Sequence, residues 1–181
     1  MMLTITVSGK ERWNEVTEEF VSGKDQVLAL EHSLVSLSKW ESKWNKPFLS
    51  KKPKSYEETV DYIRCMTLTQ NVDPSVYERI SEENIREVND YISLSMTATT
   101  FSNEQNKRLN NGIVTAEIIY YWMIALNIPF ECQKWHLNRL LTLIRVCSIK
   151  SQPEKKMSQH DVMSRNAALN AARRSQMNTK G

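Results

Sequence analysis

Apolar residues alternate with polar ones at the start of the chain and recur every three or four residues through most of the remainder. Leu3–Val7 has the period-two pattern of a half-buried strand and is rich in β-branched side chains. Gln26–Leu30 has the same character and predicts a second strand, which we expect to pair with the first. Between them, after the break at Ser8-Gly9, the charged residues 10–25 are compatible with either a short hairpin or a poor helix.

Beyond His32 the spacing of the apolar residues becomes that of an amphipathic helix. Ser33 is a suitable N-cap, and we expect Pro47 to end this helix. Residues at intervals of three and four then form an apolar face that continues to the end of the segment: Leu34, Leu37, Trp40, Trp44 and Phe48. This face either packs in the core or forms an exposed groove for an apolar partner helix.

Further helices are predicted along the rest of the chain. They begin at Ser55, at Asp73-Pro74 and at Ser81, where acidic residues fall in the first turn or proline occupies the first helical position. Residues 95–114 are polar and irregular and predict a loop. The helix that Thr115 opens is apolar on almost every side as far as Leu126, which predicts a central, buried helix.

The next helix is expected to run from about Cys132 to Ile149. Its inner stripe comprises Leu137, Leu140, Leu141 and Ile144. A last, alanine-rich helix is expected from Ser158 to about Arg174. The pattern therefore predicts a mainly α fold with a small N-terminal β-hairpin or sheet, in the α+β class. Its predicted parts are a β segment (1–31), a helical core (32–150) and a basic C-terminal helix or tail (151–181).

The net charge of +3 is unevenly distributed. Residues 1–149 hold 17 basic and 19 acidic side chains, whereas residues 150–181 hold seven basic and two acidic ones. The basic residues that we single out in this tail are Lys155, Lys156, Arg165, Arg173 and Arg174. Such a tail is either simply solvated or meets nucleic acid, an acidic protein or an anionic membrane. The tail lacks aromatic residues for base stacking and the rest of the chain is net acidic, so nucleic acid is disfavoured.

Candidate chemistry is sparse. The three histidines are scattered, and Cys132 and His136 lie four residues apart without a second pair that would complete a metal site. The three cysteines form no CxxC pair, and the chain contains neither a phosphate-binding glycine loop nor a GxSxG elbow. We therefore expect no enzymatic activity, metal or cofactor. A signal peptide and a membrane-spanning apolar run are also missing from the pattern, which favours a soluble intracellular protein.

Two aromatic-rich blocks carry a resemblance to a known family. The first is Leu30–Leu49, and the second is Thr115–Met123 with its continuation Ile128–Leu141. In this order they resemble the small tail assembly chaperones of long-tailed bacteriophages, over roughly residues 28–177. Residues 163–174 also fit the resemblance.

The resemblance implies a chaperone that holds the tape measure protein soluble in the host cell cytoplasm until the tail tube polymerises around it. The tail tube protein and a second copy of the chain are further candidate partners, and the resemblance transfers no catalytic residue. One alternative is a structural virion component, such as a neck or tail-completion protein, with permanent apolar interfaces. A second alternative is a nucleic-acid-binding regulator that uses the basic tail.

Overall fold

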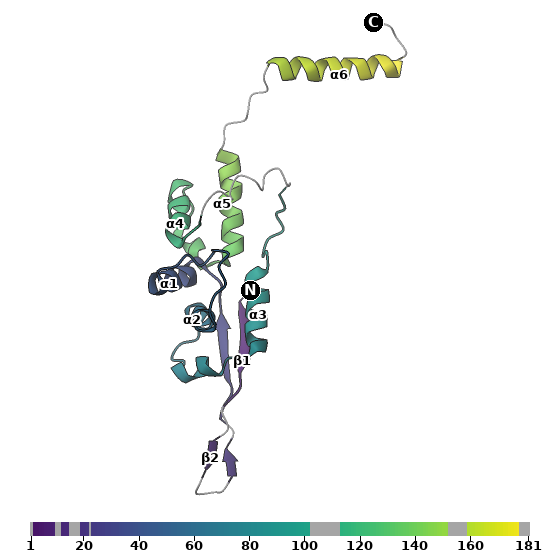
Figure 1. Cartoon of the computed structure of the whole chain (residues 1–181). Helices are drawn as coiled ribbons and strands as arrows, with labels where there is room; N and C mark the ends of the chain where they lie inside the picture. Colours follow the sequence, from purple (N-terminus) through teal and green to yellow (C-terminus); the bar gives the residue numbers. More distant parts are fainter. Residues whose placement is uncertain are drawn as a thin grey trace. The chain divides into compact units, whose positions relative to one another are not determined.

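The structure is a computed structural model that describes residues 2–9, 12–14, 19–21, 23–101, 113–151 and 159–177. The chain forms two compact units, Met1–Ser148 and Ile149–Gly181. The described residues are mostly helical, with a small antiparallel sheet near the N-terminus (Figure 1). The predicted α+β class is therefore confirmed.

The N-terminal sheet is formed by the two predicted strands. β1 (Leu3–Val7) and β4 (Gln26–Leu30) pair antiparallel. β2 (Arg12–Asn14) and β3 (Glu19–Val21) also pair antiparallel, so the segment between the long strands contains a hairpin rather than a helix. Where the two pairs meet, a Cβ on Gly9 would lie 1.9 Å from the carbonyl oxygen of Gly23, and only glycine fits there.

Three helices follow, and each begins at the expected serine. The capping serines accept hydrogen bonds from backbone N–H groups three residues ahead, as N-caps do. The helices and their caps are α1 (Leu34–Trp44) with Ser33, α2 (Tyr56–Met66) with Ser55, and α3 (Glu82–Ser93) with Ser81. The 3₁₀ helix η1 (Pro74–Arg79) lies between α2 and α3 and is capped by Asp73.

The expected end of the first helix is wrong by two residues. α1 stops at Trp44 because Asn45 adopts the left-handed conformation, with φ of 51°. Asparagine tolerates this conformation better than most residues. Pro47 lies two residues beyond this cap, where it prevents the helix from continuing.

The C-terminal part of the first unit differs from the expected pair of helices. α4 (Ala116–Ala125) is followed by the 3₁₀ helix η3 (Phe130–Lys134) and only then by α5 (Leu137–Ser151). The single helix expected from about Cys132 is interrupted because His136 is extended and forms a β-bridge with Ser33. The backbone N–H of Leu137 donates to the His32 carbonyl at 2.7 Å, which fixes the start of α5.

One core joins the sheet to the helices of the first unit. Ile5, Val7, Leu28 and Leu30 point inward from the sheet and are buried. α3 packs along β1, while α1 packs against both α2 and α4. From the predicted inner stripe of α5, Leu137, Leu140 and Ile144 are buried and Leu141 is partly buried.

The last helix, α6 (Gln159–Met177), lies in the second unit. Its side chains from Met163 to Met177 are exposed, including Arg165, Arg173 and Arg174. Lys155, Lys156 and the expected cap Ser158 lie outside the described residues. Across the described ranges, no helix is long and apolar enough to span a membrane.

Candidate functional site

Most of the apolar face predicted on the first helix is inaccessible to a partner. Leu34 and Leu37 are fully buried, Trp40 is 1% exposed and Phe48 is 8% exposed. The possibility that these side chains form an exposed groove is therefore wrong, and the alternative of core packing holds for them. Trp44 is only partly buried and lies against the core.

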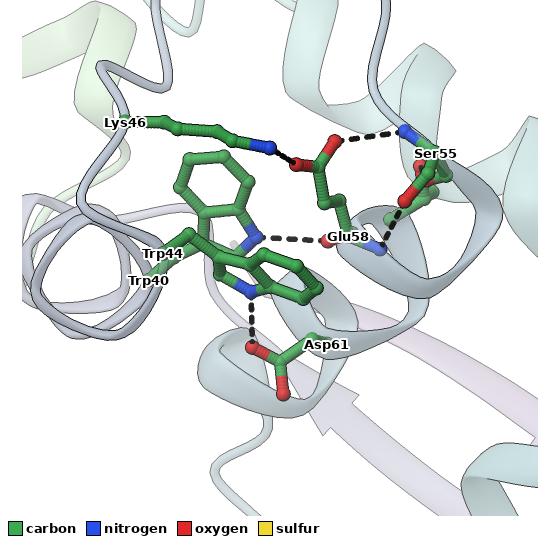
Figure 2. Close-up of polar contacts among 7 residues, drawn as sticks. Trp40, Trp44, Lys46, Ser55, Glu58 and Asp61 are labelled. Atoms are coloured by element: carbon green, nitrogen blue, oxygen red, sulfur yellow. Dashed lines mark hydrogen bonds and ion pairs between the residues drawn. The ribbon is translucent and has the colours of Figure 1, made fainter.

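The two tryptophans of α1 are turned toward α2 (Figure 2). The indole N–H of Trp40 donates to the Glu58 carbonyl at 2.8 Å, and that of Trp44 donates to Oδ2 of Asp61 at 2.9 Å. Satisfying a buried indole N–H in this way removes the main cost of placing tryptophan in a core. Burial of the apolar rings favours packing against α2, and the hydrogen bonds remove the penalty that an unpaired indole N–H would impose there.

Ion pairs line the outer side of the same interface. Lys43 contacts Asp61, and Lys46 contacts Glu58 while the Ser55 backbone N–H donates to the same carboxylate at 2.8 Å. The hydrogen bond from Lys46 and then the one from Ser55 lower the pKa of Glu58. Both lysines are more than half exposed, so these pairs orient α1 on α2 but add little stability.

The aromatic residues of the first block form part of a continuous row of rings through the core. From Trp44 the row passes to Trp40 and Phe48, with centroids 6.1 Å and then 5.1 Å apart. Phe48 stacks on Tyr62 at 3.9 Å, and Tyr62 meets the edge of His32 at 5.8 Å. The composition of this block therefore reflects a structural core, since aromatic pairs in such geometries stabilise beyond their buried area.

The row ends in a buried histidine pair that the sequence pattern did not predict. The rings of His32 and His136 lie 5.1 Å apart, and Tyr91 packs edge-on against His136 at 5.0 Å. The Asn138 backbone N–H donates to Nδ1 of His136, so the ring proton is on Nε2, which donates to the Tyr91 carbonyl at 3.1 Å.

Burial keeps both histidines neutral. It lowers the pKa of His32 to about 3, and the neighbouring His136 adds to this shift. Burial also lowers the pKa of His136, although the hydrogen bond to Tyr91 and the charge of Glu31 oppose it. The Tyr62 hydroxyl lies 2.6 Å from Nδ1 of His32, and burial raises the pKa of this tyrosine. The cluster is thus a neutral polar network within the core.

We expect acidification to destabilise the fold through this pair. Below the ordinary histidine pKa of 6.5, the unfolded chain binds protons that the folded chain does not. The free energy of unfolding should therefore fall as the pH drops, with His32 alone contributing a slope that approaches about 1.4 kcal/mol per pH unit well below 6.5. His136 should add a decrease in the same direction, because its pKa is also lowered. Urea denaturation at pH 7, 6 and 5 measures this slope. The variant His32→Asn should show a shallower slope, and an unchanged slope would contradict the assignment.

The described residues offer no sign of metal or thiol chemistry. Among them, no group of three or more histidine, cysteine, aspartate or glutamate side chains could hold a metal ion. Cys132 is buried in η3, and burial, aided by Asp61, raises the pKa of the Cys65 thiol to about 11. A thiol with so high a pKa is a poor nucleophile at neutral pH.

An accessible apolar surface lies on α4, where the sequence predicted a helix buried on every side. That prediction is wrong, because only the side with Ala116, Ile119 and Met123 is fully buried. Three large apolar side chains on the other side are exposed and lie three residues apart in sequence. We call this surface the α4 patch, and it comprises Ile118, Tyr121 and Ile124, which are 36%, 66% and 61% exposed.

An open pocket of about 850 Å³ adjoins α4. Trp122 lines it from α4, Leu141 and Ile144 line it from α5, and residues of the loop after α1 line it as well. The remaining described lining residues are Leu49, Ser50, Lys51, Lys52, Pro53, Ile113 and Val114. The pocket is therefore mainly apolar, with two lysines in its wall.

Comparison of the chain with family models, with curated protein sequences and with solved structures finds no match. The α4 patch and the pocket thus rest on the geometry of this chain. Sequence spacing shows that α4 is apolar on all sides, but it does not show which side the rest of the fold leaves uncovered. It contains no signal for the histidine pair, whose members are brought together only by the tertiary fold.

Proposed function

We propose that this chain is a non-enzymatic tail assembly chaperone that binds a phage tape measure protein in the host cytoplasm. The observation that carries the proposal is the α4 patch, Ile118, Tyr121 and Ile124, beside a mainly apolar pocket. The aromatic blocks that resemble this family supply the identity of the partner.

Such a chaperone must make apolar contact with the chain that it binds. A protein that keeps an aggregation-prone helical chain soluble must offer apolar surface of its own while remaining folded. The α4 patch meets that requirement, since its side chains are exposed although α4 is anchored through Ala116, Ile119 and Met123. An exposed tyrosine among aliphatic residues is also a common composition for a protein-binding surface.

The test is a co-expression pull-down with the tape measure protein of the same phage, combined with mass spectrometry of purified virions. Capture of the tape measure together with absence from virions is the expected result. Presence in virions at a fixed stoichiometry would overturn the chaperone proposal in favour of a structural neck or tail-completion component. Failure to capture the tape measure would equally overturn it.

A double substitution tests the surface itself. We expect Tyr121→Gln with Ile124→Gln to reduce capture of the tape measure roughly tenfold or more, because each anchor in such an interface contributes about 1 kcal/mol or more. Glutamine is a good helix former, so the melting temperature should change little. The matched control is Leu68→Gln with Leu94→Gln, two residues of similar exposure outside the patch. Equal loss in both variants would count against the α4 patch.

A further inference from the structure

The pocket beside α4 has two features that together restrict what it can bind. Its apolar wall is built by Trp122 of α4 and by Leu141 and Ile144 of α5. Its described lining residues belong to α4, α5 and two non-helical segments, and none of them belongs to a β-strand. This lining favours recognition by side chains that enter between helices, as when an amphipathic helix binds in a groove, over strand addition.

The second feature is positive charge. Lys51 and Lys52 line the pocket and are exposed, and within the described ranges neither lysine makes an ion pair. The neighbouring Lys54 is placed differently, with its ammonium 4.2 Å from the Phe48 ring centroid. No acidic side chain occurs among the described lining residues. A partner with carboxylates beside its apolar face would thus complement this wall.

The apolar surface also continues past the pocket. Ile118 lies one helical turn before Trp122, so the two side chains share one side of α4. Ile118 belongs to the α4 patch, whereas Trp122 belongs to the pocket. A surface that extends along a helix in this way fits a polypeptide better than a compact small molecule.

We propose that the pocket receives an acidic amphipathic helix of a partner protein, with its apolar face between α4 and α5 and its carboxylates against Lys51 and Lys52. This inference deepens the proposed function and rests on it, since it specifies the chemistry of the segment that the chaperone surface would hold. It concerns the type of segment and not the identity of the protein that carries it.

The experiment uses two synthetic peptides of about 20 residues, long enough to form a helix on binding. Both have leucines at helical positions i, i+3, i+4 and i+7, flanked by glutamates in one peptide and by lysines in the other. Calorimetric titration of the full chain at low salt should show that the acidic peptide binds at least fivefold more tightly than the basic one. Adding salt should reduce that preference.

Charge reversal then tests whether the two pocket lysines cause the preference for the acidic peptide. The variant Lys51→Glu with Lys52→Glu should weaken binding of the acidic peptide about fivefold and reverse the preference toward the basic peptide. The control Lys39→Glu with Lys134→Glu changes the net charge equally at two exposed positions outside the pocket, and it should leave the preference intact. Equal responses of the two variants would overturn the inference.

Three other results would also overturn it. These are equal binding of both peptides to the unaltered chain, binding of neither, and binding of dodecanoate alone, which would assign a small amphiphile to the pocket. The proposed function has its own test in the tape-measure pull-down. Peptide selectivity without tape-measure capture would remove the proposed function only, while tape-measure capture without peptide selectivity would remove the inference only.

Discussion

Replacing Trp40 with alanine is expected to lower the free energy of unfolding by about 3–5 kcal/mol. The side chain is 1% exposed, packs between the rings of Trp44 and Phe48, and donates to the Glu58 carbonyl. Alanine removes these contacts together and leaves a cavity at the interface of α1 and α2. Denaturation in urea, followed by circular dichroism, measures the loss.

The neighbouring tryptophan provides the matched comparison. Trp44→Ala should lower the free energy of unfolding by clearly less than Trp40→Ala does. Trp44 is partly exposed, and its hydrogen bond is to a carboxylate that Lys43 also contacts. Comparable losses in the two variants, or a Trp40→Ala variant as stable as the unaltered chain, would contradict this account of the core.

Replacing Glu41 with alanine is expected to cost about 2–6 kcal/mol, because it leaves two buried backbone N–H groups without an acceptor. The Glu41 carboxylate accepts hydrogen bonds at 2.7 Å from the N–H groups of Phe48 and Ala116. Thr115, at the N-cap position of α4, provides no side-chain cap, so a residue of α1 performs that task instead. The same substitution should accelerate amide hydrogen exchange at the start of α4.

Glu41→Gln tests whether the shape of this side chain or its two acceptor oxygens matter for stability. Glutamine has nearly the same shape but retains one acceptor oxygen, so the expected loss is about half that of alanine. An exposed glutamate without such contacts, Glu83→Ala in the first turn of α3, serves as the control and should change stability by less than about 0.5 kcal/mol. If Glu41→Ala lowers the free energy of unfolding by less than the control does, Glu41 does not stabilise the start of α4 as described.

Local signals account for what the sequence predicted well. The alternation in Leu3–Val7 and Gln26–Leu30, and the serines at positions 33, 55 and 81, act over a few residues, and the structure contains the strands and caps that they indicate. The fate of the apolar face on the first helix was harder to predict. The periodicity of Leu34 to Trp44 identifies an apolar face but not what covers it, and that depends on α2, which contributes the acceptors for both indoles.

The remaining differences share a tertiary origin. His136 looks like part of a helix in the sequence, but its pairing with Ser33 keeps it extended. α4 looks central because it is apolar throughout, yet the described part of the first unit covers only one of its sides fully. Whether a helix is covered on one side or on all sides is a property of the whole packing, which no single segment encodes.

The long-range hydrogen bonds of α1 and of the residue pair before it also set the order in which this protein can complete its fold during synthesis. The Glu41 carboxylate cannot accept its hydrogen bond from Ala116 until α4 has been synthesised. Likewise, the His32 carbonyl cannot accept from Leu137 until the start of α5 has been synthesised. A nascent chain released from the ribosome as far as α3 would therefore display Leu34, Leu37 and Trp40 with part of their covering still missing. Topologies that depend on such distant contacts fold slowly, and incomplete chains of this kind are prone to aggregate. A protein proposed to shelter another chain would thus itself pass through a vulnerable stage before its last helices emerge.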